Sequence, residues 1–295
     1  MKRTLLLSLC VFLGTTFLQG IAPYVQIAAL SGSVQEAREI VVASLQEKGY
    51  EVLGVYQPGN LPGLYVVGFT SQELVAFCKQ TAEQGMLAAA MKIGLQEDGD
   101  KVKISIVNPE YLFYAYFREK MDDADFKSKA ISISEGIKKD LELVGTMSLP
   151  FGGDEEISKL VKYRYMAGMP NFEKQVELAD FDSFSEGLTV IRKNLAAGKG
   201  NTTSVYELID EDAGIAVIGV GLLDAETGEA HFLPIIGEDH VAAMPYEIIL
   251  ENNKAQMLHG RFRFAVHWPE LTMGTFTKIM SSPGDVEDTM KALME

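Results

Sequence analysis

Cysteine is scarce in this sequence, with two in 295 residues, and one of them, Cys10, lies in an apolar stretch near the N-terminus. If that stretch is removed, Cys78 is left alone and the mature chain has no internal disulfide. The apolar residues around Cys78 favour a buried thiol over a reactive one. Stability must therefore come from hydrophobic cores, and a chain of this length with 47% hydrophobic residues suits about two domains.

Positively charged residues are also few. The 26 Lys and Arg residues face 41 Asp and Glu residues, which gives a formal net charge of −15. No basic run is longer than Lys138-Lys139. Phosphate backbones and anionic lipid surfaces repel such a chain, so nucleic acid is not an expected partner.

Long apolar runs are lacking outside the N-terminal segment. Lys2 and Arg3 precede an apolar run over residues 5–18, and Gly20-Ile21-Ala22 has the small residues of a cleavage site. This pattern predicts a signal peptide over residues 1–22 and an exported protein, periplasmic or extracellular. The run is shorter than the roughly 20 residues that span a bilayer. We therefore expect no transmembrane span after removal of the leader, with a retained anchor as the alternative.

Recognisable catalytic motifs are missing as well: the sequence has no nucleophile elbow, phosphate loop, dinucleotide fingerprint or His-Glu-x-x-His string. Gly152-Gly153-Asp154-Glu155 repeats four residues of a nucleotide-cyclase signature, but Glu156 stands where that signature has phenylalanine. The string also lies in a connector rich in Gly and Pro. The sequence thus favours a protein that is not an enzyme and carries no cofactor.

What is present is a clear order of elements in the first half. Ser33 and Glu36 form a capping box before a predicted helix over 34–48. Turn signals and β-branched runs then predict two strands, a helix, a hairpin around Asp98-Gly99 and an aromatic helix after Pro109. The expected strands lie over 50–56, 64–69, 86–95 and 102–107, and a last helix over 126–144.

The second half repeats this order. Ser183 and Glu186 form another capping box, and strands are expected over 203–209 and 215–222. A hairpin around Asn252-Asn253 would join strands over 246–250 and 257–266. Trp268-Pro269-Glu270 would then take the place of Asn108-Pro109-Glu110, and a final helix is expected over 285–294. The first half has a helix over 71–81 for which the second half shows no counterpart.

These matching orders predict an internal duplication. The expected fold class is α+β, with two related two-layer domains, each a small, mainly antiparallel sheet with helices packed on it. The predicted boundaries are a signal peptide at 1–22, a first domain at 23–147, a structured connector at 148–172, and a second, divergent domain at 173–295.

The unit over residues 33–117, with its capped helix, Gly49 stop, Asp98-Gly99 hairpin and Pro109-Glu110 helix, resembles the domain-of-unknown-function-302 family of bacteria. Residues 176–294 resemble the family only through their order and their Pro-Glu step, as a degenerate second copy. The resemblance implies a compact α+β domain. It implies no catalytic residue, because the activity of the family is not established.

Histidine is rare, and all four residues lie in the second half. With extended backbone between them, His259 and His267 would be roughly 26 Å apart, too far to share one ion. The sequence therefore predicts no metal site. One alternative, a metal-assisted hydrolase, would use His231, His240 and His259, with Asp239 or Glu238 as the acid.

Aromatic residues gather at two places that correspond to each other in the two halves. The helix after Pro109 carries Tyr111 and Tyr114, and His267, Trp268 and Glu270 form the matching group. A groove between paired domains could be lined by these five residues, although aromatic residues at such density also pack in cores.

The function expected from these observations is non-enzymatic binding of a small molecule or a protein partner in the cell envelope. The metal-assisted hydrolase and a purely structural or oligomerisation module are the alternatives. The sequence names neither the ligand nor the partner.

Overall fold

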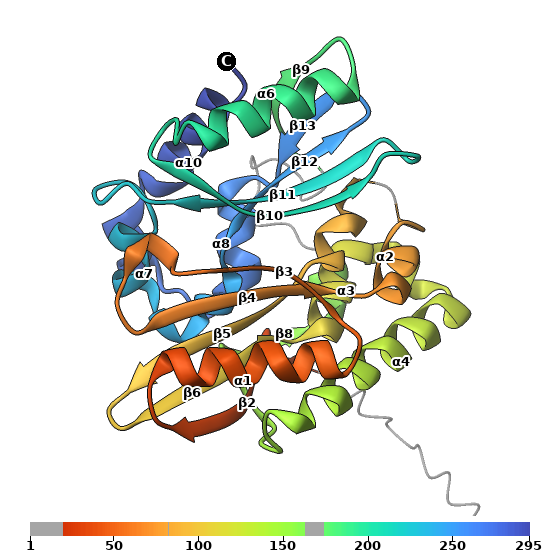
Figure 1. Ribbon diagram of the computed structural model, residues 1–295. Coiled ribbons are helices and arrows are strands. Elements are labelled where there is room, and N and C mark those ends of the chain that lie inside the picture. The colour runs from red at the N-terminus through yellow and green to blue at the C-terminus, as the bar shows by residue number, and fades with distance from the viewer. Residues whose placement is uncertain (1–19, 82, 163–173) are drawn as a thin grey trace, which may run out of the picture.

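A computed structural model describes residues 20–81, 83–162 and 174–295 (Figure 1). The predicted signal peptide lies almost wholly outside these residues, as does the end of the predicted connector. Gly20–Ile21 form a short strand, β1, that pairs with β8 (Glu155–Glu156). Within the described part of the chain, no helix is both long enough and apolar enough to cross a membrane.

The first half forms a six-stranded antiparallel sheet in the order β3-β4-β5-β6-β2-β7. One face of this sheet is covered by α1 (Val34–Glu47), which begins with the predicted capping box of Ser33 and Glu36. The strands are β2 (Tyr24–Ser31), β3 (Glu51–Tyr56), β4 (Leu64–Thr70), β5 (Met91–Asp98), β6 (Lys101–Val107) and β7 (Leu149–Phe151), and the other α-helices are α2 (Gln72–Cys78), α3 (Pro109–Phe117), α4 (Ala124–Asp140) and α5 (Ile157–Val161).

The second half forms a five-stranded antiparallel sheet in the order β10-β11-β12-β13-β9. Its first helix, α6 (Phe184–Ala196), is capped by Ser183 as predicted. The strands are β9 (Val176–Asp180), β10 (Thr202–Asp210), β11 (Ile215–Leu222), β12 (Tyr246–Glu251) and β13 (Lys254–Met257), and the other α-helices are α7 (Glu229–Ile236), α8 (Gly260–His267), α9 (Met273–Phe276) and α10 (Ser282–Ala292). The α+β fold class is confirmed.

The two sheets have the same strand order when β2 to β6 are matched with β9, β10, β11, β12 and β13. The registers fix which positions correspond. Lys92 pairs with Gly68 in the first sheet, and Glu247 pairs with Gly219 in the second. The hairpins then bring Asn108 and His259 to the same place, where each is the N-cap of the next helix.

Several expectations from the sequence are wrong. The strand expected over 86–95 begins only at Met91, after a 3₁₀ segment over residues 83–89. Residues 257–266 are not one strand, because β13 ends at Met257 and α8 follows. The helix is buried on most of its sides, which hides its periodicity. His259-Gly260 therefore corresponds to Asn108-Pro109, and Trp268-Pro269-Glu270 does not.

The second half also has the helix that it was expected to lack. The helix α7 occupies the place of α2, after a turn in which Asp224 accepts hydrogen bonds from the backbone N–H groups of Glu226 and Thr227. The sequence pattern also missed the strands that open each half, β2 and β9.

The halves pack against each other through reciprocal contacts. The 3₁₀ segment η5 (Glu238–Ala243) lies on β5, and η2 (Glu83–Ala89) lies against β12. The edge strands β3 and β10 also meet, and η1 (Pro58–Asn60) contacts α7. In the first two contacts, a 3₁₀ segment of one half lies on the central part of the other half's sheet. In Figure 1 the second half, green to blue, lies mostly above the first half, which is red to yellow-green.

Candidate functional site

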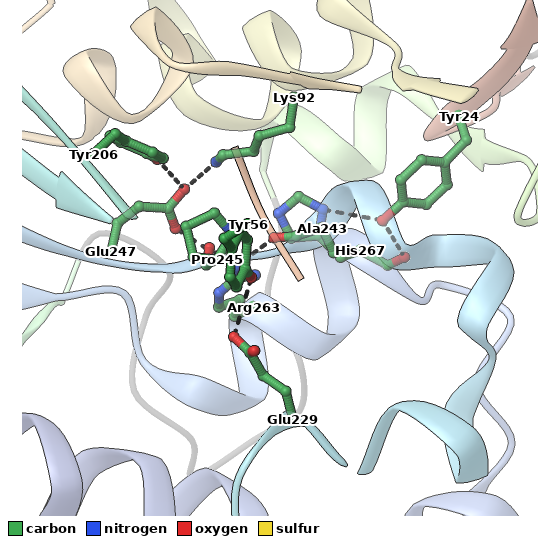
Figure 2. Close-up of polar contacts among 10 residues, drawn as sticks. All are labelled: Tyr24, Tyr56, Lys92, Tyr206, Glu229, Ala243, Pro245, Glu247, Arg263 and His267. Atoms are coloured by element: carbon green, nitrogen blue, oxygen red, sulfur yellow. Dashed lines mark hydrogen bonds and ion pairs between the residues drawn. The ribbon is translucent and has the colours of Figure 1, made fainter. Parts of the chain in front are cut away.

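Charged side chains are buried where the two halves meet. Lys92 on β5 forms an ion pair with Glu247 on β12, and both side chains are almost fully buried. Arg263 on α8 lies 3.5 Å from the same carboxylate and donates to the carbonyl groups of Ala243 and Pro245. We call Lys92, Tyr206, Glu247 and Arg263 the interface cluster (Figure 2).

Burying the charged groups of the interface cluster away from water costs free energy. Burial lowers the pKa of Lys92, and the neighbouring Glu247 carboxylate opposes this effect. The guanidinium of Arg263 also lies over the ring of Tyr246, with its carbon 4.0 Å from the ring centroid. A buried pair of this kind adds little net stability but is expensive to break. The cluster therefore places opposite charges of the two halves against each other, away from water.

Tyr206 is packed between glycines of both sheets. A Cβ atom on Gly219 would lie 2.6 Å from its ring and one on Gly68 would lie 3.3 Å away. Gly54 on β3 faces the same residue, and its Cβ would be 2.0 Å from the carbonyl oxygen of Val205. The hydroxyl of Tyr206 donates to Glu247 at 3.1 Å. Glycine at these positions lets β3 and β10 come close enough to enclose the ring.

A second buried carboxylate joins the halves at the start of α7. Glu229 is fully buried and accepts hydrogen bonds from the Gly59 N–H at 2.8 Å and the Tyr56 hydroxyl at 3.1 Å. A Cβ on Gly59 would lie 2.4 Å from the Ala230 nitrogen, so only glycine allows this approach. Burial raises the pKa of Glu229 to about 7, although these hydrogen bonds oppose the shift.

Next to the interface cluster lies a group of aromatic rings around His240. The imidazole is buried, with ring centroids 4.8 Å from Tyr24, 5.7 Å from Phe151 and 5.8 Å from Trp268. Its Nδ1 lies 3.0 Å from a carboxylate oxygen of Asp239. Because of this hydrogen bond, the pKa of Asp239 is lowered and its carboxylate is ionised at neutral pH.

A pocket opens beside this group, on the face of the first sheet that is turned toward the second half. We call it the sheet pocket, and its volume is about 200 Å³. Four of its residues come from the first sheet's β2, β5 and β6, one comes from β7 and one from η5 of the second half. They are Gln26, Gln96, Lys103, Ser105, Phe151 and Asp239.

The structure places three of the five predicted ligand residues around His240. Trp268 and His267 are buried, with their ring centroids 6.2 Å apart, and Glu270 Oε1 lies 3.8 Å from His240 Nε2. Trp268 also lines a smaller pocket of about 80 Å³ between α8 and α9. Neither Trp268 nor Glu270 lines the sheet pocket.

The other two predicted residues, Tyr111 and Tyr114, are buried in the core with the rest of α3. The Tyr111 hydroxyl donates to the Val266 carbonyl of the second half at 2.8 Å. The aromatic helix therefore packs against the other half, and the sheet pocket is lined without it.

The histidines proposed for a metal site are not brought together. His231 lies on α7, His240 is enclosed by aromatic rings, and His259 caps α8 by accepting from the Arg261 N–H. Among the described residues, no group of three or more His, Cys, Asp or Glu side chains is placed to hold an ion.

His267 belongs to the buried contacts between the halves. The Tyr24 hydroxyl donates to its carbonyl oxygen at 3.1 Å and lies 3.3 Å from its Nδ1. Burial lowers the pKa of His267 well below its usual value, and the nearby Arg263 adds to the effect. The imidazole is therefore neutral at pH 7.

Sequence reasoning missed the interface cluster and most of the sheet pocket. Lys92 and Glu247 are single charged residues inside apolar strands, and this was a signal that could have been used. No such signal marks Gln26, Gln96 or Ser105, because polar residues on strands are also common on solvated faces.

Comparison with known proteins adds little to this geometry. No protein-family model matches the chain, and no curated protein matches it either. Among solved structures, the chain is similar to the uncharacterized conserved protein DUF302 from Bacillus stearothermophilus, with 18% sequence identity and a TM-score of 0.35. The similarity covers 41% of this chain and 98% of the other. A likeness at this level carries no argument about function.

Proposed function

We propose that this protein is exported and consists of two domains that together bind a small polar molecule in the sheet pocket. The observation that carries the proposal is the lining of the pocket, in which five of six side chains are polar and both halves contribute. Pockets between domains, with a few convergent polar groups, are common ligand sites. The duplication predicted from the sequence accounts for such a pocket, since it lies where the equivalent units meet.

The test is a native mass spectrum of the mature protein purified from its own compartment, compared with the mass after denaturation. We expect extra mass that is lost on denaturation. The variant Ser105→Leu, which places a larger side chain on the floor of the pocket, should abolish the extra mass. Ser128→Leu on the exposed face of α4 is the matched control.

A bare mass in the wild-type protein, or extra mass that Ser105→Leu leaves unchanged, would contradict binding in this pocket. The folded state of each variant is checked by its thermal unfolding transition. The leader is tested separately, because N-terminal sequencing of the purified protein shows whether cleavage occurs after Ala22.

A further inference from the structure

The centre of the sheet pocket is lined by three uncharged polar side chains on neighbouring strands. Gln26 on β2 pairs directly with Ser105 on β6. Gln96 on β5 pairs with Lys103, two residues from Ser105, so Gln96 and Ser105 are diagonal neighbours on the same face. Ser105 therefore lies between the two glutamines, and a small ring placed over its hydroxyl lies between their amide groups.

These three side chains keep hydrogen-bonding capacity that a ligand can use. Gln26 Nε2 donates to the Ala28 carbonyl at 3.3 Å, which leaves the carbonyl oxygen of its amide. Within the described part of the chain, neither the Gln96 amide nor the Ser105 hydroxyl takes part in a side-chain hydrogen bond. Amides and hydroxyls both donate and accept. Hydroxyl groups of a ligand, which also do both, are their natural complement.

The two charged side chains that line the sheet pocket already have partners in the protein. Lys103 Nζ lies 2.8 Å from Asp98 Oδ2 at the β5–β6 hairpin. The Asp239 carboxylate contacts Nδ1 of His240 at 3.0 Å. The pocket therefore does not need a charged ligand, and the net charge of −15 works against an anionic one.

Phe151 gives the pocket an apolar wall beside Gln26. It lies two residues along β7 from Leu149, the partner of Gln26, and is therefore a diagonal neighbour of that glutamine. Its ring is stacked on Tyr24, with centroids 5.2 Å apart, and lies 5.7 Å from His240. A flat aromatic base needs an open ring face for stacking, whereas the C–H groups of a sugar pack against whatever part of a ring is exposed.

We propose that the sheet pocket takes an uncharged monosaccharide, a pentose or a hexose. Its hydroxyl groups would bind Gln26, Gln96 and Ser105, and its C–H groups would contact Phe151. The proposal rests on the proposed function, because it names the ligand class of the same pocket. A pocket of about 200 Å³ has room for one sugar ring, because cavities of roughly 150 Å³ hold the six-membered ring of benzene.

The experiment is calorimetric titration of the full mature protein with D-glucose, D-galactose, D-mannose, D-ribose, D-xylose and L-arabinose. We expect at least one of them to bind, with the same affinity in about 50 mM and about 500 mM sodium chloride, because salt screens only charged contacts. Gln96→Ala should weaken this binding at least about five-fold, the effect of losing one neutral hydrogen bond or more. Gln46→Ala, at an exposed position on α1, is the matched control. The thermal unfolding transition of each variant shows that it is folded.

Affinity that is unchanged in Gln96→Ala, or that falls with salt, would overturn the proposal, as would the failure of all these sugars to bind. The native mass spectrum separates this failure from that of the proposed function. A bound amine, acid or nucleobase that Ser105→Leu removes would leave the pocket function standing and refute the sugar. A pocket empty in both experiments would refute both.

Discussion

The two halves of this protein share one strand order, yet the corresponding positions that face each other carry unlike side chains. Lys92 in the first half corresponds to Glu247 in the second, and the two form an ion pair. Gly54 corresponds to Tyr206, since each follows a β-bulge and pairs with an equivalent glycine. The first half thus supplies the cation Lys92 and the glycine that leaves space, Gly54. The second half supplies the anion Glu247 and the aromatic ring of Tyr206.

The helices that follow the hairpins differ in the same way. Counting from the N-caps, Leu112 on α3 corresponds to Arg263 on α8, and Tyr116 corresponds to His267. The first half has an apolar, aromatic helix where the second half has a charged one. We infer that similar units become a fixed pair when their contact positions diverge into complements, because each half then fits the other better than it fits itself.

The largest expected effect comes from removing the shared anion. Glu247→Gln keeps the shape of the side chain but leaves Lys92 without its ion-pair partner and removes one carboxylate from Arg263. We expect a loss of about 3–5 kcal/mol in the free energy of unfolding, as for other broken buried pairs. Urea unfolding of the purified protein measures it.

The matched control is Glu207→Gln, which breaks the pair with Arg192 on the outer surface of the second half. Exposed pairs contribute less than about 1 kcal/mol. Equal losses of unfolding free energy for the two variants would show that the buried pair of the interface cluster contributes no more than an exposed pair.

Glu229 is expected to make stability depend on pH. Its pKa of about 7 in the folded state lies above the ordinary value, so the native state binds the proton more tightly than the unfolded state. The contribution is fully present below about pH 4.5 and is lost as the pH rises through about 7, a total of roughly 3 kcal/mol.

Glu229→Gln should remove this dependence. We expect the variant to match the wild type near pH 5 and to be more stable than it at pH 8, by up to roughly 3 kcal/mol. Urea unfolding at both pH values checks this. A variant that is less stable than the wild type at pH 8 would show that the ionised carboxylate is the favoured form.

A smaller loss in the free energy of unfolding is expected when a hydrogen bond to Glu247 is removed at Tyr206. Tyr206→Phe removes the hydroxyl that donates to Glu247, and a hydrogen bond to a buried charged group contributes about 2 kcal/mol. Tyr50→Phe is the comparison, since its hydroxyl donates to Asp140 within the first half at a half-buried site. We expect the larger loss at Tyr206 in urea unfolding. The reverse order would mean that contacts within a half dominate.

Much of the framework could be predicted from the sequence because its signals are local. The capping residues Ser33 and Ser183 and the hairpin turns Asp98-Gly99 and Asn252-Asn253 act over a few residues. The prediction failed at α8, because six of its eight residues are buried and it lacks the polar face by which a helix is recognised. The opening strands β2 and β9 were missed for lack of a turn signal before them.

The candidate site could be predicted only in part. Trp268 and His267 were singled out by residue type and do lie at the junction of the halves. The sheet pocket draws its lining from β2, β5, β6, β7 and η5, and no spacing along the chain relates Gln26 to Asp239. Only the packing of one half on the other brings such residues together.

The smallest expected effect comes from a second contact between a strand end of one half and a helix of the other. The turn after β3 reaches the start of α7 through Gly59 and Glu229, and the end of β10 reaches the C-terminal end of α2, where Lys79 pairs with Asp210. This second contact lies at the surface, with 37% of the Lys79 side chain exposed. We expect Lys79→Gln to lower the free energy of unfolding by less than about 1 kcal/mol.

Tyr56→Phe, measured at pH 8 where Glu229 is ionised, is the partner experiment, and its expected loss is about 2 kcal/mol. The ratio of the two losses compares an exposed with a buried polar contact between the halves. If Lys79→Gln costs as much as Tyr56→Phe, burial does not set the strength of these contacts. If it costs less, the buried contact is the stronger, as expected for the buried pair of Lys92 and Glu247.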